Sequence, residues 1–259
     1  MAKAVLAFEK IENFNEWDAA FSDERIEKAQ SYRFDDDKKR CLLAELLLKK
    51  ALLEFGVMAE EIQYSYNEHG KPYLKDFENL FFNISHSGEY VLCAVSDCEI
   101  GLDIEKIDPI NLRIAERFFT KAEFEAITKE PEAGQYDAFY SFWTRKEAYV
   151  KCIGKGMSCA FNSFDVNDLP DYKFIELDEF SGYKCSMCTK EQIEELKIVN
   201  DTCLCPVCKK HVFTEKYEIC PVCDWENDPV QRKDPDFAGG ANKLSLNDAI
   251  KEYEDKANE

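Results

Sequence analysis

Two acidic residues, separated by one residue, offer the first candidate chemistry in this sequence. Asp103 and Glu105 lie in the segment GLDIE, where polar and apolar residues alternate. Side chains of a β-strand alternate between its faces, so both carboxylates share one face, about 7 Å apart along the strand. Such a pair suits a hard divalent cation, which prefers oxygen ligands. A half-buried strand with a solvated polar face has the same pattern, so the pair alone does not define a site.

A third carboxylate comes from the segment FWTRKEAYVK, for which we expect a helix. Trp143, Glu147 and Lys151 are spaced four residues apart, which places them on one helical face. Taken alone, an ion pair beside a core tryptophan explains the pattern. Together with the strand carboxylates, Glu147 completes an oxygen-rich magnesium site, and Lys151 adds positive charge for a phosphate or a leaving group.

Other polar and basic residues suit an anionic ligand. Ser85 and His86 end an apolar strand in NISHSG, and Lys71 lies in a Gly-Lys-Pro turn upstream. Phosphate contact is one interpretation of these residues, and a structural histidine is the other. A basic run in the otherwise acidic chain suits either a phosphate clamp or a solvated helix face. The run consists of Arg25, Lys28, Arg33, Lys38, Lys39 and Arg40.

Two cysteine pairs near the C-terminus predict a metal site. Cys205 and Cys208 form one C-P-x-C turn, and Cys220 and Cys223 form another after eleven residues. Two such turns complete a tetrahedral site of four thiolates. Zinc is favoured over iron because a structural zinc needs no redox partner. A metal staple for a domain too small to have its own core is the simplest role, and a docking module is the alternative.

These residues need a framework that positions them. The leucine spacing predicts a helix over residues 35–55, ended by Gly56. Residues 79–105 read as strands broken by turns, one of them at Ser87-Gly88. We expect helices over 112–118, 121–128 (capped by Thr120) and 137–152, and a C-terminal helix capped by Ser245 with Asp248. Strands are expected over 163–166, 172–177 and 183–189. Residues 190–199 are expected to form a linker or a helix. This alternation predicts an α/β or α+β architecture, with a domain boundary near residue 200.

Composition excludes some classes of function. The chain has 33 Lys+Arg against 52 Asp+Glu, a net charge of −19, which argues against a general nucleic-acid binder. Residues 201–259 alone hold 8 Lys+Arg against 13 Asp+Glu, a net of −5. No apolar run reaches 18 residues, and the apolar stretch at the start is too short for a secretory signal. We therefore expect a cytoplasmic protein with no membrane partner and with reduced thiols.

Five motifs occur in a single order along residues 1 to about 190. They are GKP (70–72), FNISHSG (82–88), GLDIEK (101–106), RFFTKAEF (117–124) and FWTRKEAYVKCIGKG (142–156). In order and spacing they resemble the Sfp-type 4′-phosphopantetheinyl transferases. The resemblance implies an α+β fold of two pseudo-twofold halves, residues 1–106 and 107–198. The remaining residues, 199–259, resemble the small cysteine-rich CPCC domains and are expected to form a zinc-knuckle domain.

The resemblance also implies a reaction: transfer of phosphopantetheine from coenzyme A to a serine of an acyl or peptidyl carrier protein, releasing adenosine 3′,5′-bisphosphate. It implies that Asp103, Glu105 and Glu147 hold Mg²⁺ on the diphosphate. Lys151 would contact the phosphates and protonate the leaving oxygen. The expected nucleotide contacts are Arg25, Lys28, Arg40 and Lys71 on the phosphates, with Ser85 and His86 at the 3′-phosphate and diphosphate. Glu123 matches a further acidic position, and family analogy suggests a monomer.

The attacking serine must lose a proton, and a carboxylate beside the metal is the available base. We favour Glu147, with Glu105 or a metal-bound hydroxide as rivals. Ile110, Leu112, Phe118 and Phe119 lie where this family usually meets its carrier, although core packing explains them equally well. The alternative hypothesis is a catalytically silent, coenzyme A-binding and zinc-stapled interaction protein. The intact acidic and basic site residues favour the active enzyme.

Overall fold

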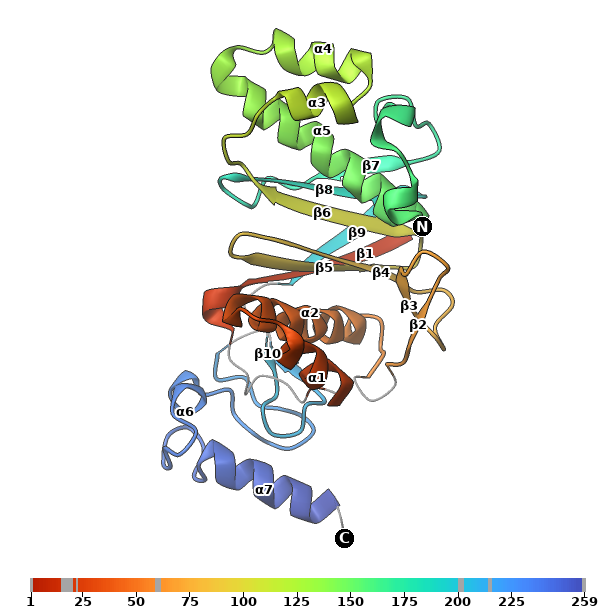
Figure 1. The fold of residues 1–259 in the computed structure, drawn as a ribbon. Helices are drawn as coiled ribbons and strands as arrows, with labels where there is room; N and C mark the ends of the chain where they lie inside the picture. The colour runs from red at the N-terminus through yellow and green to blue at the C-terminus, as the bar shows by residue number, and fades with distance from the viewer. Residues whose placement is uncertain are drawn as a thin grey trace. The chain divides into compact units, whose positions relative to one another are not determined.

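The computed structural model describes residues 2–14, 21, 23–58, 62–199, 203–213 and 216–257 of the 259-residue chain. The chain forms two compact units (Figure 1). The first contains Met1–Phe8 and Ile62–Ile198, and the second contains Glu9–Glu61 and Val199–Glu259. Each unit is therefore assembled from segments that are distant in sequence.

The first unit mixes strands and helices. Its elements are β1 (Ala2–Lys10), β2 (Tyr64–Tyr66), β3 (Pro72–Leu74), β4 (Phe81–Ser87), β5 (Tyr90–Ser96), β6 (Ile100–Lys106), α3 (Arg113–Phe118), α4 (Lys121–Lys129), α5 (Glu132–Ile153), η4 (Gly156–Ser158), η5 (Phe161–Ser163), β7 (Lys173–Glu176), β8 (Tyr183–Thr189) and β9 (Ile193–Val199). This content agrees with the expected α+β class, and it confirms the strands expected over 79–105 and the three helices after them.

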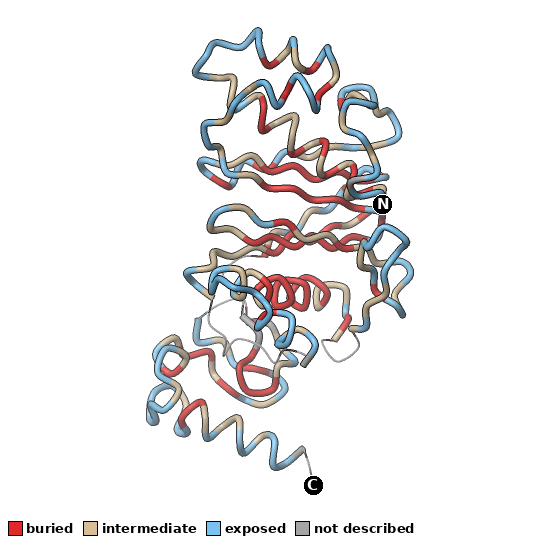
Figure 2. Tube along the Cα trace, viewed as in Figure 1, coloured by how far each residue is buried: buried red, intermediate tan, exposed pale blue. Residues whose placement is uncertain are grey.

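Two sheets lie side by side in this unit. One has the strand order β4-β5-β1-β9, and the other has the order β6-β8-β7, with β8 antiparallel to both of its neighbours. Buried apolar side chains from both sheets form one shared core, which includes Leu6, Leu92, Leu102 and Met187. Burial in Figure 2 accordingly follows the strands of both sheets.

Helix α5 lies across β6 and β8 (Figure 1). Gly101 permits this close approach, because a Cβ atom there would collide with the backbone of Ala148 and Cys152. The helix ends at Gly154, which has a left-handed φ of 67°. The approach brings the chemical groups of α5 against those of β6.

Two sequence expectations in this unit are wrong. Residues 163–166 do not form a strand: η5 ends at Ser163, and the Val166 amide donates to Glu123 Oε1 at 3.0 Å. Residues 190–199 form neither a linker nor a helix, because Ile193–Val199 is strand β9 beside β1. Their local pattern is polar and charged, so distant pairing with β1 decided the structure.

The second unit contains η1 (Ile11–Asn13), α1 (Asp23–Ser31), α2 (Asp35–Leu53), β10 (Cys203–Leu204), β11 (Val212–Phe213), α6 (Pro229–Lys233) and α7 (Leu246–Ala257). Helix α2 and its stop at Gly56 (φ 77°) confirm the expected helix. Ser245 Oγ accepts from the Asp248 amide at 3.1 Å, which confirms the expected cap of α7. None of the helices within the described residues is long and apolar enough to cross a membrane.

Candidate active site

The Asp103 carboxylate lies at the centre of the candidate site and is only 3% exposed. Its Oδ1 atom accepts hydrogen bonds from Lys151 Nζ at 2.6 Å and from Ser85 Oγ at 3.0 Å. Lys151 Nζ also donates to Leu102 O at 3.0 Å and Ser85 Oγ at 3.2 Å. Burial raises the pKa of Asp103, and Lys151 opposes that rise. Strand β6 and helix α5 thus bring a predicted metal ligand and a predicted phosphate contact together.

Glu105 and Glu147 lie close enough to Asp103 to feel its charge. Burial, followed by repulsion from Asp103, raises the pKa of Glu105, and a hydrogen bond from Ser87 Oγ at 2.8 Å opposes the rise. Burial and repulsion from Asp103 also raise the pKa of Glu147, to which Glu105 adds. Three carboxylates that destabilise one another's charge are the expected signature of a site that receives a cation.

A divalent ion fits this group of carboxylates. Among the described residues, Asp103 Oδ2 is buried and has no hydrogen-bond partner, while Oδ1 has two. An oxygen in that state calls for a partner, and three carboxylates form the oxygen donor set that Mg²⁺ prefers. The carboxylates are less tightly grouped than the cysteines of the two C-P-x-C turns. Among the described residues, only those cysteines bring at least three ligand atoms within 4.8 Å of one another.

A ladder of side chains joins β4 to β6, although the two strands exchange no ladder of backbone hydrogen bonds. Asn83 Oδ1 accepts from the Leu102 amide at 2.9 Å. Ser85 Oγ accepts from the Ile104 amide at 3.2 Å, and Ser87 Oγ accepts from the Lys106 amide at 3.0 Å. Both serines also donate to the carboxylates of β6, so the ladder fixes the strand and orients its acidic side chains.

The sequence analysis missed Asn83 and Ser87 as parts of the site. Alternating small polar residues at positions 83, 85 and 87 of one strand were the available signal, because they share one face. His86 lies between the two serines, points to the other face and is exposed. The structure therefore separates Ser85 and His86, which the sequence treated as a pair.

Lys71 and a neighbouring cavity lie at the end of α5. The Lys71 ammonium donates to the carbonyls of Ile100, Lys151 and Cys152 at 3.2, 2.6 and 3.0 Å. Burial lowers the pKa of Lys71. The side chain also lines a cavity of about 240 Å³. The other lining residues are Asn67, Pro72, Tyr73, Phe81, Phe82, Glu99, Cys152, Ile153 and Gly154.

Three predicted phosphate contacts belong to the second unit. Arg25 Nε donates to the buried Glu45 carboxylate at 2.8 Å, and Lys49 binds the other oxygen of that carboxylate at 2.6 Å. Arg40 donates to Asp37 Oδ1 at 2.8 Å, and Lys28 is exposed on α1. Glu45 therefore anchors Arg25 between α1 and α2.

Glu123 has a structural role in this chain. Its Oε2 accepts from Lys146 Nζ at 2.8 Å and from the Thr120 amide at 2.8 Å, and both charged side chains are fully buried. Lys146 Nζ also donates to the carbonyls of Phe161 and Phe164 at 2.7 and 2.6 Å. This cluster links α4, α5 and the segment after α5. It also confirms the N-cap predicted at Thr120, which Glu123 extends to a capping box.

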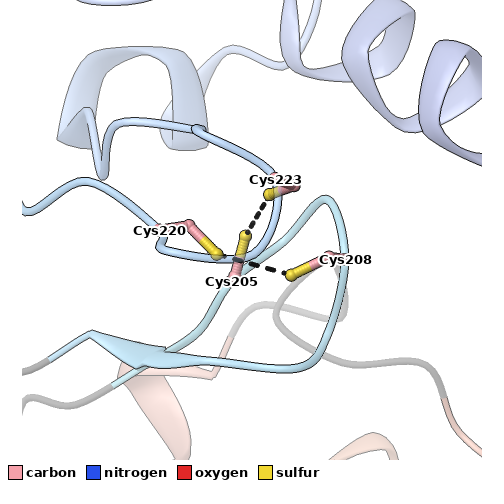
Figure 3. Close-up of side chains that lie close together, drawn as sticks. All are labelled: Cys205, Cys208, Cys220 and Cys223. Carbon is pink, nitrogen blue, oxygen red and sulfur yellow. Dashed lines mark hydrogen bonds between the residues drawn. The ribbon is translucent and has the colours of Figure 1, made fainter.

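The four cysteines of the two C-P-x-C turns converge (Figure 3). Cys205 and Cys223 sulfurs lie 3.4 Å apart, and those of Cys208 and Cys220 lie 3.5 Å apart. All four sulfurs lie within 4.8 Å of one another, so the group can hold a metal ion. Hydrogen bonds among the four thiols lower the pKa of Cys208 and raise the pKa of Cys205, so the thiols of the group do not lose their protons independently. A thiolate is the form that binds metal.

The two cysteine turns have matching backbones. Lys209 and Asp224, each one residue past its turn, have left-handed φ values of 58° and 62°. The Lys209 amide donates to Cys205 O at 3.0 Å, and the Asp224 amide donates to Cys220 O at 2.9 Å. Apolar side chains including Phe213, Trp225 and Leu246 pack around the sulfurs. A residue other than glycine in the left-handed backbone region costs free energy. The two turns accept that cost at equivalent positions, which indicates that their conformation serves to hold the sulfurs.

Comparison with known proteins supports both parts of the chain. The profile of the 4′-phosphopantetheinyl transferase superfamily matches residues 99–199, and that of the 4′-phosphopantetheinyl transferase N-terminal region matches residues 12–98. The profile of the cysteine-rich CPCC family matches residues 203–257. The predicted resemblances are thereby confirmed.

Individual relatives are also named as phosphopantetheinyl transferases. The 4′-phosphopantetheinyl transferase gsp of Aneurinibacillus migulanus is 37% identical over 207 residues, covering 71% of this chain and 86% of that protein. The transferase Sfp of Bacillus subtilis is 37% identical over 183 residues, which cover 64% of this chain and 81% of that protein. The mouse L-aminoadipate-semialdehyde dehydrogenase-phosphopantetheinyl transferase is 34% identical over 163 residues, which cover 56% of this chain and 53% of that protein. This chain belongs to the 4′-phosphopantetheinyl transferase superfamily and carries a cysteine-rich CPCC domain at its C-terminal end.

Proposed function

We propose that this protein transfers 4′-phosphopantetheine from coenzyme A to a serine of an acyl or peptidyl carrier protein. The observation that carries the proposal is the group formed by Asp103, Glu105, Glu147 and Lys151 across β6 and α5. Three carboxylates and one ammonium in a partly buried site are what attack on a diphosphate requires. Membership of the transferase superfamily supports the same reaction.

The proposed metal ligands are Asp103 through Oδ2, Glu105 and Glu147. Mg²⁺ bound there would neutralise charge on the diphosphate oxygens and so make the phosphorus open to attack. Oδ1 of Asp103 stays with Ser85 and Lys151, which leaves Oδ2 as the oxygen free to coordinate.

Lys151 is the proposed general acid. Its side chain is 27% exposed, and two of its three hydrogen bonds go to the side chains of Ser85 and Asp103, which can give way to an entering phosphate. A proton on Nζ can then pass to the oxygen that leaves with adenosine 3′,5′-bisphosphate. Glu147 is the favoured base for the carrier serine, because burial and repulsion raise its pKa toward the working pH. Glu105 and a metal-bound hydroxide are the rival bases.

The nucleotide half of coenzyme A needs an apolar recess and basic groups. The cavity beside Lys71 is lined by Tyr73, Phe81 and Phe82, and its size and aromatic lining suit a purine ring. For the phosphates we propose Ser85, His86, Arg25, Lys28 and Arg40. Lys71 lines the cavity with its side chain, while its ammonium binds three backbone carbonyls.

A carrier panel tests the function. Purified protein is incubated with coenzyme A, MgCl₂ and several apo-carrier proteins, and each carrier is weighed by intact-protein mass spectrometry. We expect a gain of one phosphopantetheine on at least one carrier, matched by release of adenosine 3′,5′-bisphosphate. Asp103→Asn is the inactive control. No mass gain across fatty-acid, polyketide and nonribosomal-peptide carriers, with tight coenzyme A binding retained, would instead support the silent binding protein.

We propose that the C-terminal domain binds one structural Zn²⁺ through Cys205, Cys208, Cys220 and Cys223 and works in a reducing compartment such as the cytoplasm. Elemental analysis of the purified protein should give about one zinc per chain. Cys205→Ser should lose the metal and unfold this domain while transfer persists. Loss of transfer on only some carriers would assign the domain to carrier docking. We also propose a monomer, which light scattering measures directly.

A further inference from the structure

The last turn of α5 carries Lys151 and depends on the loop between β2 and β3. A helix leaves its final carbonyls without intrahelical partners, and a buried helix end must find donors for them. Lys71 supplies two of these donors, to the carbonyls of Lys151 and Cys152 at 2.6 and 3.0 Å. A cation at this end of a helix also opposes the negative pole of the helix dipole.

Lys71 reaches β6 with the same ammonium. Its third hydrogen bond goes to the Ile100 carbonyl at 3.2 Å. Ile100 lies three residues before Asp103 on one strand, and Lys151 lies two residues before the end of α5. A single side chain therefore fastens the strand that bears the proposed metal ligand to the turn that bears the proposed acid.

Asn67 of the same loop completes the attachment. Its Nδ2 donates to the Gly154 carbonyl at 2.9 Å. Its Oδ1 accepts from the amides of His69 and Lys71 at 2.9 and 2.8 Å, which fixes the backbone from which the Lys71 side chain extends. The loop thus holds three carbonyls at the end of α5 through two side chains.

The three bonds account for all three N–H groups of the Lys71 ammonium, and every acceptor is a backbone carbonyl. Lys151 also makes three bonds, but two of its acceptors are the side chains of Ser85 and Asp103, which can rearrange. A phosphate bound at Nζ would have to displace a carbonyl and leave it without that donor. The resemblance implied a phosphate contact for Lys71, and the geometry favours a different role. We propose that Lys71 is a positioning residue, which fixes Lys151 relative to Asp103 by fastening the end of α5 to β6. This proposal rests on the transferase function proposed above.

Substitution of Lys71 separates the two roles. Lys71→Met keeps the length of the side chain and removes the ammonium, and Lys75→Met is the matched control, an exposed lysine on the same hairpin. Binding of adenosine 3′,5′-bisphosphate is measured by calorimetry, and turnover is measured with saturating coenzyme A and apo-carrier. We expect Lys71→Met to change the nucleotide Kd by less than about threefold and to lower kcat about 10- to 100-fold, because a displaced acid transfers its proton poorly. Lys75→Met should change neither quantity.

Two further readouts distinguish positioning from general damage. Lys71→Arg should restore part of kcat because it keeps donors and charge. Hydrogen exchange of amides 148–156 should speed up in Lys71→Met, whether or not any carrier is found. If Lys71→Met does not fold, Asn67→Ala, which removes only the Gly154 contact, should show the same exchange change and a smaller loss of kcat.

The opposite result overturns the proposal. A nucleotide Kd weakened more than tenfold in Lys71→Met, with kcat and amide exchange unchanged, would make Lys71 a phosphate ligand. If the wild-type protein modifies no carrier, the transferase function fails by itself. Amide exchange and nucleotide Kd then still decide whether Lys71 holds the end of α5.

Discussion

Helix α5 carries two lysine–carboxylate pairs five residues apart, and they differ in how completely their atoms are paired. Lys146 and Glu123 are both fully buried, 2.8 Å apart, and share further bonds with two carbonyls, two amides and a hydroxyl. Lys151 is 27% exposed beside Asp103, whose second oxygen has no partner among the described residues. One pair is saturated, and the other is left open on one side.

Saturation is what a structural ion pair needs. A buried charge is costly unless every bond it can make is made, and the Lys146–Glu123 cluster comes close to that condition. An incomplete pair is costly to the fold but useful to a reaction, because the unpaired Asp103 oxygen can engage a ligand and the partly exposed Lys151 can exchange a side-chain acceptor for one. The comparison separates the acidic residue that this chain uses for folding from those we propose for chemistry.

The largest effect is expected from breaking the saturated pair. Lys146→Met leaves the Glu123 charge buried without its partner and should lower the free energy of unfolding by about 3–5 kcal/mol. Urea denaturation followed by circular dichroism measures the loss. Lys151→Met, the same substitution on the same helix, should cost less than half as much. Equal losses would mean that the two pairs do not differ as proposed.

The open pair should show the reverse balance between stability and turnover. Lys151→Met removes the proposed general acid and should lower kcat about 10²- to 10⁴-fold while the protein remains folded. Lys155→Met, an exposed lysine just beyond the helix, is the control and should keep normal turnover. Near-normal turnover in Lys151→Met would remove Lys151 from the mechanism.

Local pattern was sufficient for many elements. The apolar spacing in α2, the alternation in β4 to β6 and the caps at Thr120 and Ser245 were predictable because neighbours in sequence determine them. Strand β9 was not predictable, because only pairing within a sheet that includes β1, nearly 200 residues away, makes a polar and charged segment extended.

The residues of the candidate site likewise divide into those that the sequence predicts and those that it does not. Asp103, Glu105, Glu147 and Lys151 follow from strand and helix periodicity and from the motifs, and α5 and β6 bring them together. The buried Lys146 was missed because a lysine in a charged helix is expected on the surface. The carbonyls held by Lys71 were also beyond sequence analysis, since backbone acceptors at a distant helix end leave no trace in residue types.

The side-chain ladder is expected to support the open pair at intermediate cost. Ser85→Ala leaves the Ile104 amide and Asp103 Oδ1 short of a partner and should lower stability by about 1–3 kcal/mol and kcat by about tenfold. Ser96→Ala is the matched control, because Ser96 is a buried serine that donates to the Lys3 carbonyl at 2.8 Å, outside the site. It should lose stability alone. Unchanged kcat in Ser85→Ala would limit the ladder to a structural role.

The smallest expected effect is the loss of folding stability that the charged, metal-free Glu147 carboxylate causes. Burial and repulsion raise the pKa of Glu147, so the folded state binds its proton more tightly than the unfolded chain does. Stability must therefore fall as pH rises from the ordinary glutamate pKa through the raised one. Glu147→Gln removes this penalty and, in buffer without Mg²⁺, should raise Tm by a few degrees at pH 7. The gain should vanish below the ordinary pKa, where the wild-type carboxyl is neutral as well.

Glu116→Gln, a change at an exposed glutamate of α3, controls for charge alone and should leave Tm nearly unchanged at both pH values. Adding Mg²⁺ should raise the Tm of the wild-type protein and reduce its difference from Glu147→Gln, because a bound cation offsets the repulsion among the three carboxylates. A Glu147→Gln variant with a lower Tm than wild type at pH 7 would mean that the Glu147 charge is already compensated in the metal-free protein. The carboxylates around the open pair would then need no cation to balance them, and the distinction from the saturated pair of Lys146 and Glu123 would lose that support.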